Sequence, residues 1–122
     1  SSIGEAFPLH CLASGKAMLS TFTEADFHKR MGRKPLDEHT PATITSISEL
    51  FDEVQLVKQS NIAFDREEHI VGVSAIGTPL QEPSGKLYAV SIPVPTVRFK
   101  QKEKQLVKAL LNCRARILDE FA

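Results

Sequence analysis

The sequence predicts an α/β domain of the α+β kind, in which helices flank an antiparallel sheet. Two apolar, β-prone runs over residues 70–80 and 86–94 surround the turn Glu82-Pro83-Ser84-Gly85, and Pro and Gly at such a tip favour a hairpin. Apolar residues at helical spacing before and after these runs predict the helices. A chain of 122 residues is long enough for one core, so we expect a single domain over residues 1–122.

Two short helices are expected after an irregular or extended lead-in over residues 1–10. Residues 12–22 predict the first, with Ser14 as its N-cap. The second begins at Thr23, which has an aspartate three residues later as in a capping pattern, and ends at Gly32. Its apolar face consists of Phe27 and Met31.

A third helix is expected after a polar loop over residues 33–40 and an extended or turn segment over residues 40–45. We place its start at Ser48 and its end at Asn61, because Asn tolerates the left-handed conformation that ends many helices. Its apolar stripe consists of Leu50, Phe51, Val54 and Val57.

The second strand of the hairpin has two different faces, because successive side chains point to opposite sides of a strand. One face is bulky and suits a core: Tyr88, Val90, Ile92 and Val94. The other carries Leu87, Ala89, Ser91 and Pro93, and the partner strand is equally short of bulk at Gly72, Ser74, Ala75, Gly77 and Thr78. A face of small residues fits either a bound small ligand or a closely packed helix.

A long closing helix is expected over residues 102–121. Its apolar residues recur at steps of three and four: Leu106, Ala109, Leu110, Cys113, Ile117, Leu118 and Phe121. This spacing places Cys113 in the core.

Composition excludes several classes of protein. Lys and Arg balance Asp and Glu, so the formal net charge is zero and no basic stripe is available for a phosphate backbone. No apolar run is long enough for a membrane span, and the start is not that of a signal peptide. The two cysteines, Cys11 and Cys113, have no spacing signature and favour a reducing compartment, so we expect a cytoplasmic protein.

Gly15-Lys16 is the first candidate for chemistry. A phosphate loop would need Gly where His10 stands and a hydroxyl where Ala17 stands, so that interpretation fails. The backbone N–H groups of Ser14, Gly15 and Lys16 nevertheless open a helix, and a helix start attracts an anion. The alternative is an ordinary capped helix with a solvated Lys16.

Other candidates for chemistry are weaker. Asp65, Glu67 and His69 would share a face on a strand, but they lack the further ligand that a closed zinc site needs. His10 and Cys11 are adjacent, and adjacent side chains point apart on a strand. The sequence therefore predicts no metal, no cofactor and no enzyme activity.

Motifs spread over essentially the whole chain resemble the effector-binding domain of IclR-type bacterial transcription regulators. They occur in the family's order and spacing: Pro8-Leu9-His10, Ala13 to Leu19, Thr43-Ile44-Thr45, Asp65 to Glu68, Gly72-Val73, Pro79, Ser84-Gly85 and Ala89 to Ser91. The resemblance implies a GAF-like fold without the family's first strands, which precede the stretch matching residues 7–10. It also implies that the amino-terminal winged helix-turn-helix is absent, so DNA would be bound only through that missing domain.

The resemblance further implies a small organic acid or related metabolite as ligand and a homo-oligomer, dimeric or tetrameric, as the working state. Family ligands are held around the segment matching Ser14-Gly15-Lys16, and by residues matching Asp65, Ala75, Ser91 and Pro93. Ala75 stands where some members have Cys, and Pro93 where some have Ser, so the ligand here would be less polar or more dependent on Ser91 and the helix start. An oligomerisation module without a ligand and a small enzyme built around Asp65 are the alternatives.

Overall fold

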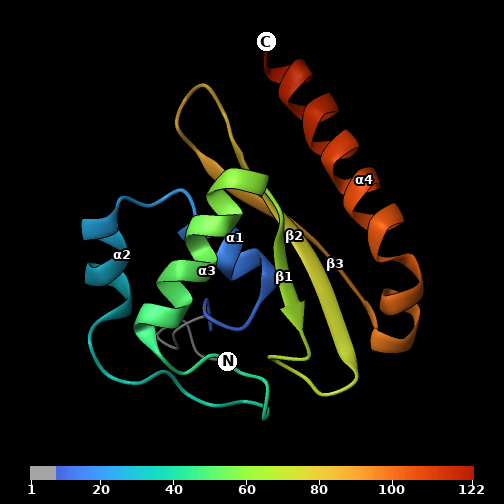
Figure 1. The fold of residues 1–122 in the computed structure, drawn as a ribbon. Coiled ribbons are helices and arrows are strands. Elements are labelled where there is room, and N and C mark those ends of the chain that lie inside the picture. Colours follow the sequence, from blue (N-terminus) through green and yellow to red (C-terminus); the bar gives the residue numbers. More distant parts are fainter. Residues whose placement is uncertain (1–7) are drawn as a thin grey trace, which may run out of the picture.

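The computed structural model describes residues 8–122, which form four helices and three strands (Figure 1). In chain order they are α1 (Ala13–Leu19), α2 (Glu24–Met31), α3 (Ile47–Ser60), β1 (Ala63–Arg66), β2 (Val73–Gln81), β3 (Leu87–Pro95) and α4 (Thr96–Phe121). The prediction of an antiparallel sheet flanked by helices is confirmed. Most of the expected lead-in, residues 1–7, lies outside the described residues.

The three strands form one sheet in the order β1-β2-β3, and both pairings are antiparallel. The expected hairpin joins β2 to β3, and the Gly85 N–H donates to the Glu82 carbonyl at 2.8 Å across its tip. Gly85 has φ +95°, a conformation that L-residues with side chains rarely adopt. The first strand of the hairpin begins at Val73 rather than residue 70, because residues 67–72 form a bend that Gly72 closes with φ +87°.

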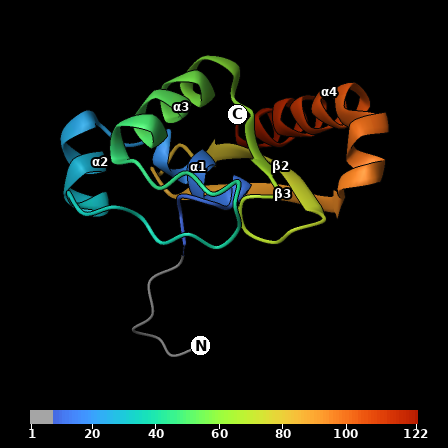
Figure 2. The same ribbon diagram turned by 60° about the horizontal axis from the view of Figure 1, so that its bottom comes forward.

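Helices cover both faces of the sheet (Figure 2). α4 packs on the face that the sequence predicted to be bulky, where Val90, Ile92 and Val94 contact a buried cluster. That cluster consists of Ile62, Ile76, Phe99 and Leu110. On the other face, α1 lies between the sheet and α3. A second core lies where α1, α2 and α3 meet, formed by Leu19, Phe27, Leu50 and Val54.

Three helix ends lie where the sequence predicted them. The Thr23 hydroxyl accepts the Asp26 N–H at the start of α2, Gly32 ends that helix, and Asn61 ends α3 in the left-handed conformation with φ 63°. The starts of α1, α3 and α4 were predicted wrongly. Ser46, rather than Ser48, caps α3 by accepting the Glu49 N–H.

The start of α1 was also predicted wrongly. Leu12 occupies the N-cap position with an extended backbone, and Ser14 is already the second residue of the helix. Within the described residues, no side chain caps α1. The prediction failed because a serine near a helix start favours the cap, whereas here the preceding turn over residues 8–11 sets the start.

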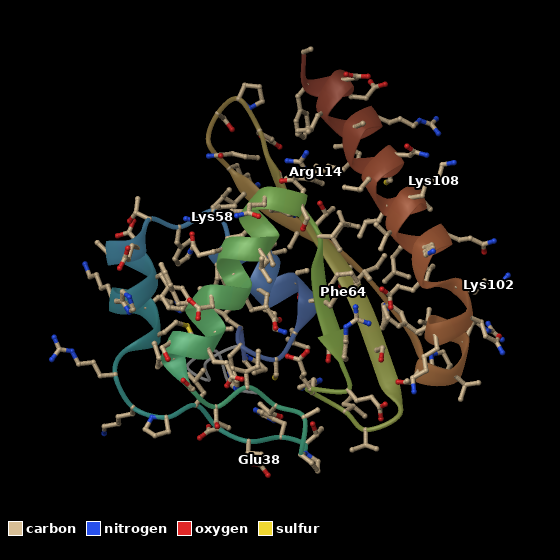
Figure 3. All side chains as sticks on the ribbon, in the orientation of Figure 1. Glu38, Lys58, Phe64, Lys102, Lys108 and Arg114 are labelled. Carbon is tan, nitrogen blue, oxygen red and sulfur yellow. The ribbon has the colours of Figure 1, made fainter. Side chains whose placement is uncertain are left out.

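The closing helix is longer than predicted, because it begins at Thr96 directly after Pro95. Cys113, expected in the core, is exposed. The sheet-facing stripe continues to Arg114 instead, which reaches toward the hairpin (Figure 3) and donates its Nε–H to the Pro79 carbonyl at 2.9 Å. Tyr88, which was expected on the core face of β3, is also exposed. Its hydroxyl donates to Glu82 at the hairpin end.

Within residues 8–122, no helix combines the length and the apolar character that crossing a bilayer requires.

Candidate functional site

The sheet register aligns most of the predicted ligand-binding residues on one face. Asp65 pairs with Ala75, and Ala75 pairs with Pro93, so these three lie in one row across β1, β2 and β3. Ser91 lies one step along β3, where its register partner is Gly77. Because residues two apart on a strand share a face, all of these positions face the same side of the sheet.

That side of the sheet is covered by α1. A Cβ built on Gly77 would lie 2.9 Å from the backbone of Ala13, the first residue of the helix. The small-residue face therefore accommodates a closely packed helix, one of the two interpretations left open by the sequence. Cover is uneven along the row: Asp65 and Ala75 are 4% and 7% exposed, whereas Ser91 and Pro93 at the β3 edge are exposed.

Gly15 is in equally tight contact. A Cβ at this position would lie 2.4 Å from the Leu9 backbone, which means that a side chain here would displace the segment leading into α1. Gly15 is thus required for the packing of α1 whether or not its N–H group meets a ligand.

Asp65 organises the bend that follows β1. Its Oδ1 accepts the Glu68 N–H at 2.8 Å, and this closes a turn in which Glu67 has φ 58°. Burial raises the pKa of the Asp65 carboxyl above its ordinary value of 3.8, although the Glu68 N–H and the Lys16 charge act in the opposite direction. The carboxylate is therefore a buried acceptor at the centre of the site.

Lys16 is fully buried, contrary to the solvated alternative. Its Nζ donates to Glu53, to Glu68 Oε1 at 2.5 Å and to the Phe64 carbonyl at 2.8 Å. An ammonium has three donors, so the described contacts use all of them. Burial also raises the pKa of Glu68, a shift that Lys16 partly offsets.

The loop before α3 is fastened to this centre by two threonines. The Thr40 hydroxyl donates to the Glu67 carbonyl and the Thr43 hydroxyl to the Glu68 carbonyl, both at 2.5 Å. Both threonines are buried. These hydrogen bonds hold the loop over residues 37–45 against the end of β1.

Sequence reasoning missed Glu53, Glu68 and Thr40 as members of this network, because each comes close to Lys16 or Asp65 only through the fold. The one available signal is the type of residue: a lysine among small apolar residues in a short helix needs an acidic partner if it is buried.

The candidate trio of Asp65, Glu67 and His69 does not gather around one point. The carboxylates of Asp65 and Glu67 accept backbone N–H groups of the bend itself, from Glu68 and from Gly72 at 2.7 Å. These bonds explain the acidic residues at the end of β1 without a metal.

His10 and Cys11 lie close together, contrary to the expectation for neighbours on a strand. Their ligand atoms and that of His39 all lie within 4.8 Å of one another. The reason is that residues 9–11 form a turn, in which the Cys11 N–H donates to the Pro8 carbonyl. Burial raises the pKa of the Cys11 thiol to about 11, and the charges of Asp65 and Glu68 act in the same direction.

Comparison with known proteins agrees with this architecture. The chain is 40% identical over 111 residues to the HTH-type transcriptional regulator Rv1719 of Mycobacterium tuberculosis, covering 91% of this chain and 42% of that protein. It is 39% identical to the DNA-binding transcriptional repressor YiaJ of Escherichia coli, covering 98% of this chain and 44% of that protein. The chain thus spans less than half the length of these relatives.

A solved structure has the same fold with a ligand. It is the inducer-binding domain of a double mutant of the PobR transcription factor from Acinetobacter, in complex with 3-hydroxybenzoic acid. The TM-score is 0.81 at 26% identity, with 95% of this chain and 68% of that chain covered.

Residues 1–119 match the family described as bacterial transcriptional regulator IclR C-terminal. Together with the relatives above, this match shows that the chain belongs to the IclR family of transcriptional regulators, as a C-terminal effector-binding domain.

Proposed function

We propose that this domain senses a small organic acid, which binds on the sheet face formed by Asp65, Ala75, Ser91 and Pro93, next to the start of α1. The observation that carries the proposal is the register, which brings Asp65, Ala75 and Pro93 into one row with Ser91 beside it. Ser14 and Gly15 belong to the helix that covers this face. Lys16 contributes indirectly, by holding the acidic bend in place.

The chemistry of the row supports a ligand with an apolar body and polar groups at its ends. Ala75 and Pro93 offer no hydrogen-bonding side chain, so they suit contact with the apolar body of the ligand. Buried Asp65 can accept a hydrogen bond from a ligand hydroxyl, whereas a ligand carboxylate beside it would be repelled. The ligand carboxylate therefore belongs near the Ser91 hydroxyl and the first N–H groups of α1, which no side chain of the described residues caps.

A hydroxylated carboxylic acid meets both requirements. The PobR domain, which shares the fold, was solved with such a molecule, 3-hydroxybenzoic acid. For the present chain we propose the class of small hydroxy acids, without assigning one compound.

We further propose that ligand binding here controls DNA binding by another part of the parent protein. The formal net charge of this chain is zero, whereas DNA-binding domains are commonly basic, so we propose that the signal passes through geometry. Self-association of the domain, most simply with twofold symmetry, would let a ligand change the spacing of two DNA-binding units. Light scattering of the full-length parent with and without the acid would test this: a monomer in both conditions excludes it.

The ligand site is tested by thermal unfolding of the protein with a panel of small carboxylic acids, including 3-hydroxybenzoate and benzoate as a matched pair. A ligand that binds only the folded state raises the apparent Tm, and we expect the hydroxylated acid to raise it more. Ser91→Ala should reduce the shift. Ser84→Ala, in the exposed hairpin tip, is the matched control and should keep it. No shift with any acid, or an equal loss in both variants, would contradict the proposed site.

A further inference from the structure

We propose that His10, Cys11 and His39 form a binding site for a divalent transition-metal cation of the Zn²⁺ type. Their three ligand atoms lie within 4.8 Å of one another. Imidazole nitrogen and thiolate sulfur are the side-chain ligands that Zn²⁺ prefers. The proposal departs from the sequence-based expectation of no metal, because His39 joins the other two only through the loop between α2 and α3.

His10 makes a hydrogen bond of the kind that metal-binding histidines make. Its Nε2 lies 2.8 Å from the Asp37 carbonyl oxygen, and a carbonyl can only accept, so Nε2 must carry the proton. In the neutral imidazole, Nδ1 then keeps a free lone pair. Histidine ligands of metals commonly donate their second N–H to a backbone carbonyl in this way, which fixes the tautomer and the ring orientation.

The geometry needs only a small adjustment. Zn–N bonds of about 2.1 Å and a Zn–S bond of about 2.3 Å place tetrahedral ligand atoms roughly 3.5 Å apart. The present separations, which are at most 4.8 Å, therefore exceed those of the bound arrangement by no more than about 1.3 Å. His10 and Cys11 are buried and held by the turn, while His39 is exposed and can rotate toward them.

A surface cleft gives access to the site from the side of its two histidines. The cleft has a volume of about 480 Å³, and its lining includes His10 and His39 together with the cationic side chains Arg30 and Lys34, whereas Cys11 lies behind it. The carboxylates of Asp65 and Glu68 act on the Cys11 sulfur, and their negative charge attracts a cation, while the positive charge of Lys16 acts in the opposite direction. On binding, the metal–sulfur bond forms as the S–H bond breaks, and the proton leaves to solvent.

A metal at this place would fasten the loop that carries His39 to the turn that starts α1. That loop also holds Thr40 and Thr43, which bind the acidic bend. The cation would therefore add a cross-link to the loop beside the proposed ligand face, a role independent of any organic acid.

The test uses tag-free protein with Cys113→Ser as background, because exposed Cys113 could bind metal by itself. Co²⁺ is titrated while its thiolate charge-transfer and tetrahedral ligand-field absorption is recorded, and Zn²⁺ then competes it off. We expect one Co²⁺ per chain. His39→Ala should weaken Zn²⁺ binding by at least about 10-fold, and Cys11→Ala should remove the charge-transfer band.

His28→Ala is the matched control, since His28 is an exposed histidine on α2 outside the trio. It should bind Zn²⁺ as the background protein does. The proposal is overturned if the background protein shows no tetrahedral Co²⁺ spectrum, or if His28→Ala and His39→Ala weaken binding equally. Because His39 is exposed, its replacement leaves the fold intact, and circular dichroism of each variant verifies this.

Discussion

Lys16 joins three separate parts of the chain through one ammonium group. It lies on α1, while its acceptors are Glu53 on α3, the Phe64 carbonyl on β1 and Glu68 in the bend after β1. A buried ammonium is costly unless its donors are paired, and here each has an acceptor. The same side chain offsets part of the burial cost of Glu68.

Replacing Lys16 tests this network. Lys16→Met keeps most of the volume but leaves Glu53 and Glu68 close together without their cation. Removing one member of a buried ion pair destabilises a protein by about 3–5 kcal/mol, and we expect a loss of this order in urea unfolding. Lys29→Met, on the exposed surface of α2, should change the free energy of unfolding by less than about 0.5 kcal/mol. Similar effects in both variants would rule out the network as described.

The raised pKa of Asp65 predicts a pH dependence with a definite sign. Above its ordinary value of 3.8 and up to the raised pKa, the folded protein binds more protons at this group than the unfolded chain. The contribution of Asp65 to the free energy of unfolding therefore falls as pH rises through that window. Asp65→Asn keeps an oxygen acceptor for the Glu68 N–H but does not titrate, so its stability relative to the wild type should increase as pH rises through that window.

Glu103 provides a control of opposite sign. Arg66 lowers the pKa of the Glu103 carboxyl below its ordinary value of 4.5, so its contribution is present above that value and is lost as pH falls through the lowered pKa. Glu103→Gln should therefore lose stability relative to the wild type as pH rises. Urea unfolding at several pH values measures both differences. Parallel trends in the two variants would contradict the assignment.

At the scale of elements, the contact between α1 and β2 is the tightest part of the site. Gly77 has no space for a Cβ, which would lie 2.9 Å from the carbonyl carbon and oxygen of Ala13. Gly77→Ala must push α1 away from the sheet, and such overpacking typically costs about 1–3 kcal/mol. Ser91→Ala, at the register partner on β3, adds no volume and should be close to neutral. Chemical denaturation of both variants measures the difference, and a neutral Gly77→Ala would mean that α1 is not held this closely.

Most elements could be predicted from the sequence because their signals are local. The alternation in β3, the Thr23 cap and the left-handed Asn61 each depend on a few neighbouring residues, and each was found where expected. β1 was not predicted as a strand, because its four residues are stabilised mainly by pairing with β2. Cys113 was placed in the core because its spacing fits a helical stripe, but the neighbouring residue Arg114 faces the sheet and bonds to Pro79, while Cys113 is exposed.

The site residues likewise fall into those that the sequence could identify and those that depend on long-range contacts. The resemblance to a family selected Asp65, Ala75, Ser91 and Pro93, and the register, which sequence spacing does not reveal, places them on one face. The buried partners of Lys16 and the approach of His39 to Cys11 could not be predicted, because they depend on how loops far apart in the chain meet.

In the whole molecule, the two faces of the sheet differ in packing and in chemical character. The face under α4 is filled by large side chains and forms a core. The face under α1 carries small residues, a buried carboxylate and an exposed serine, and one end of it opens at the β3 edge. A ligand there would contact α1, β2 and β3 at once, so it could change how firmly these elements are held together.

Backbone amide hydrogen exchange, with and without the acid that raises the apparent Tm most, tests this central claim most directly. Ligand on the α1-covered face should slow exchange at the start of α1 and in β2 and β3 around Ala75 and Ser91. Exchange along α4 should change little. Slowing confined to the groove of α4 lined by Ala109, Cys113 and Ile117, with none in β2 or β3, would contradict the account.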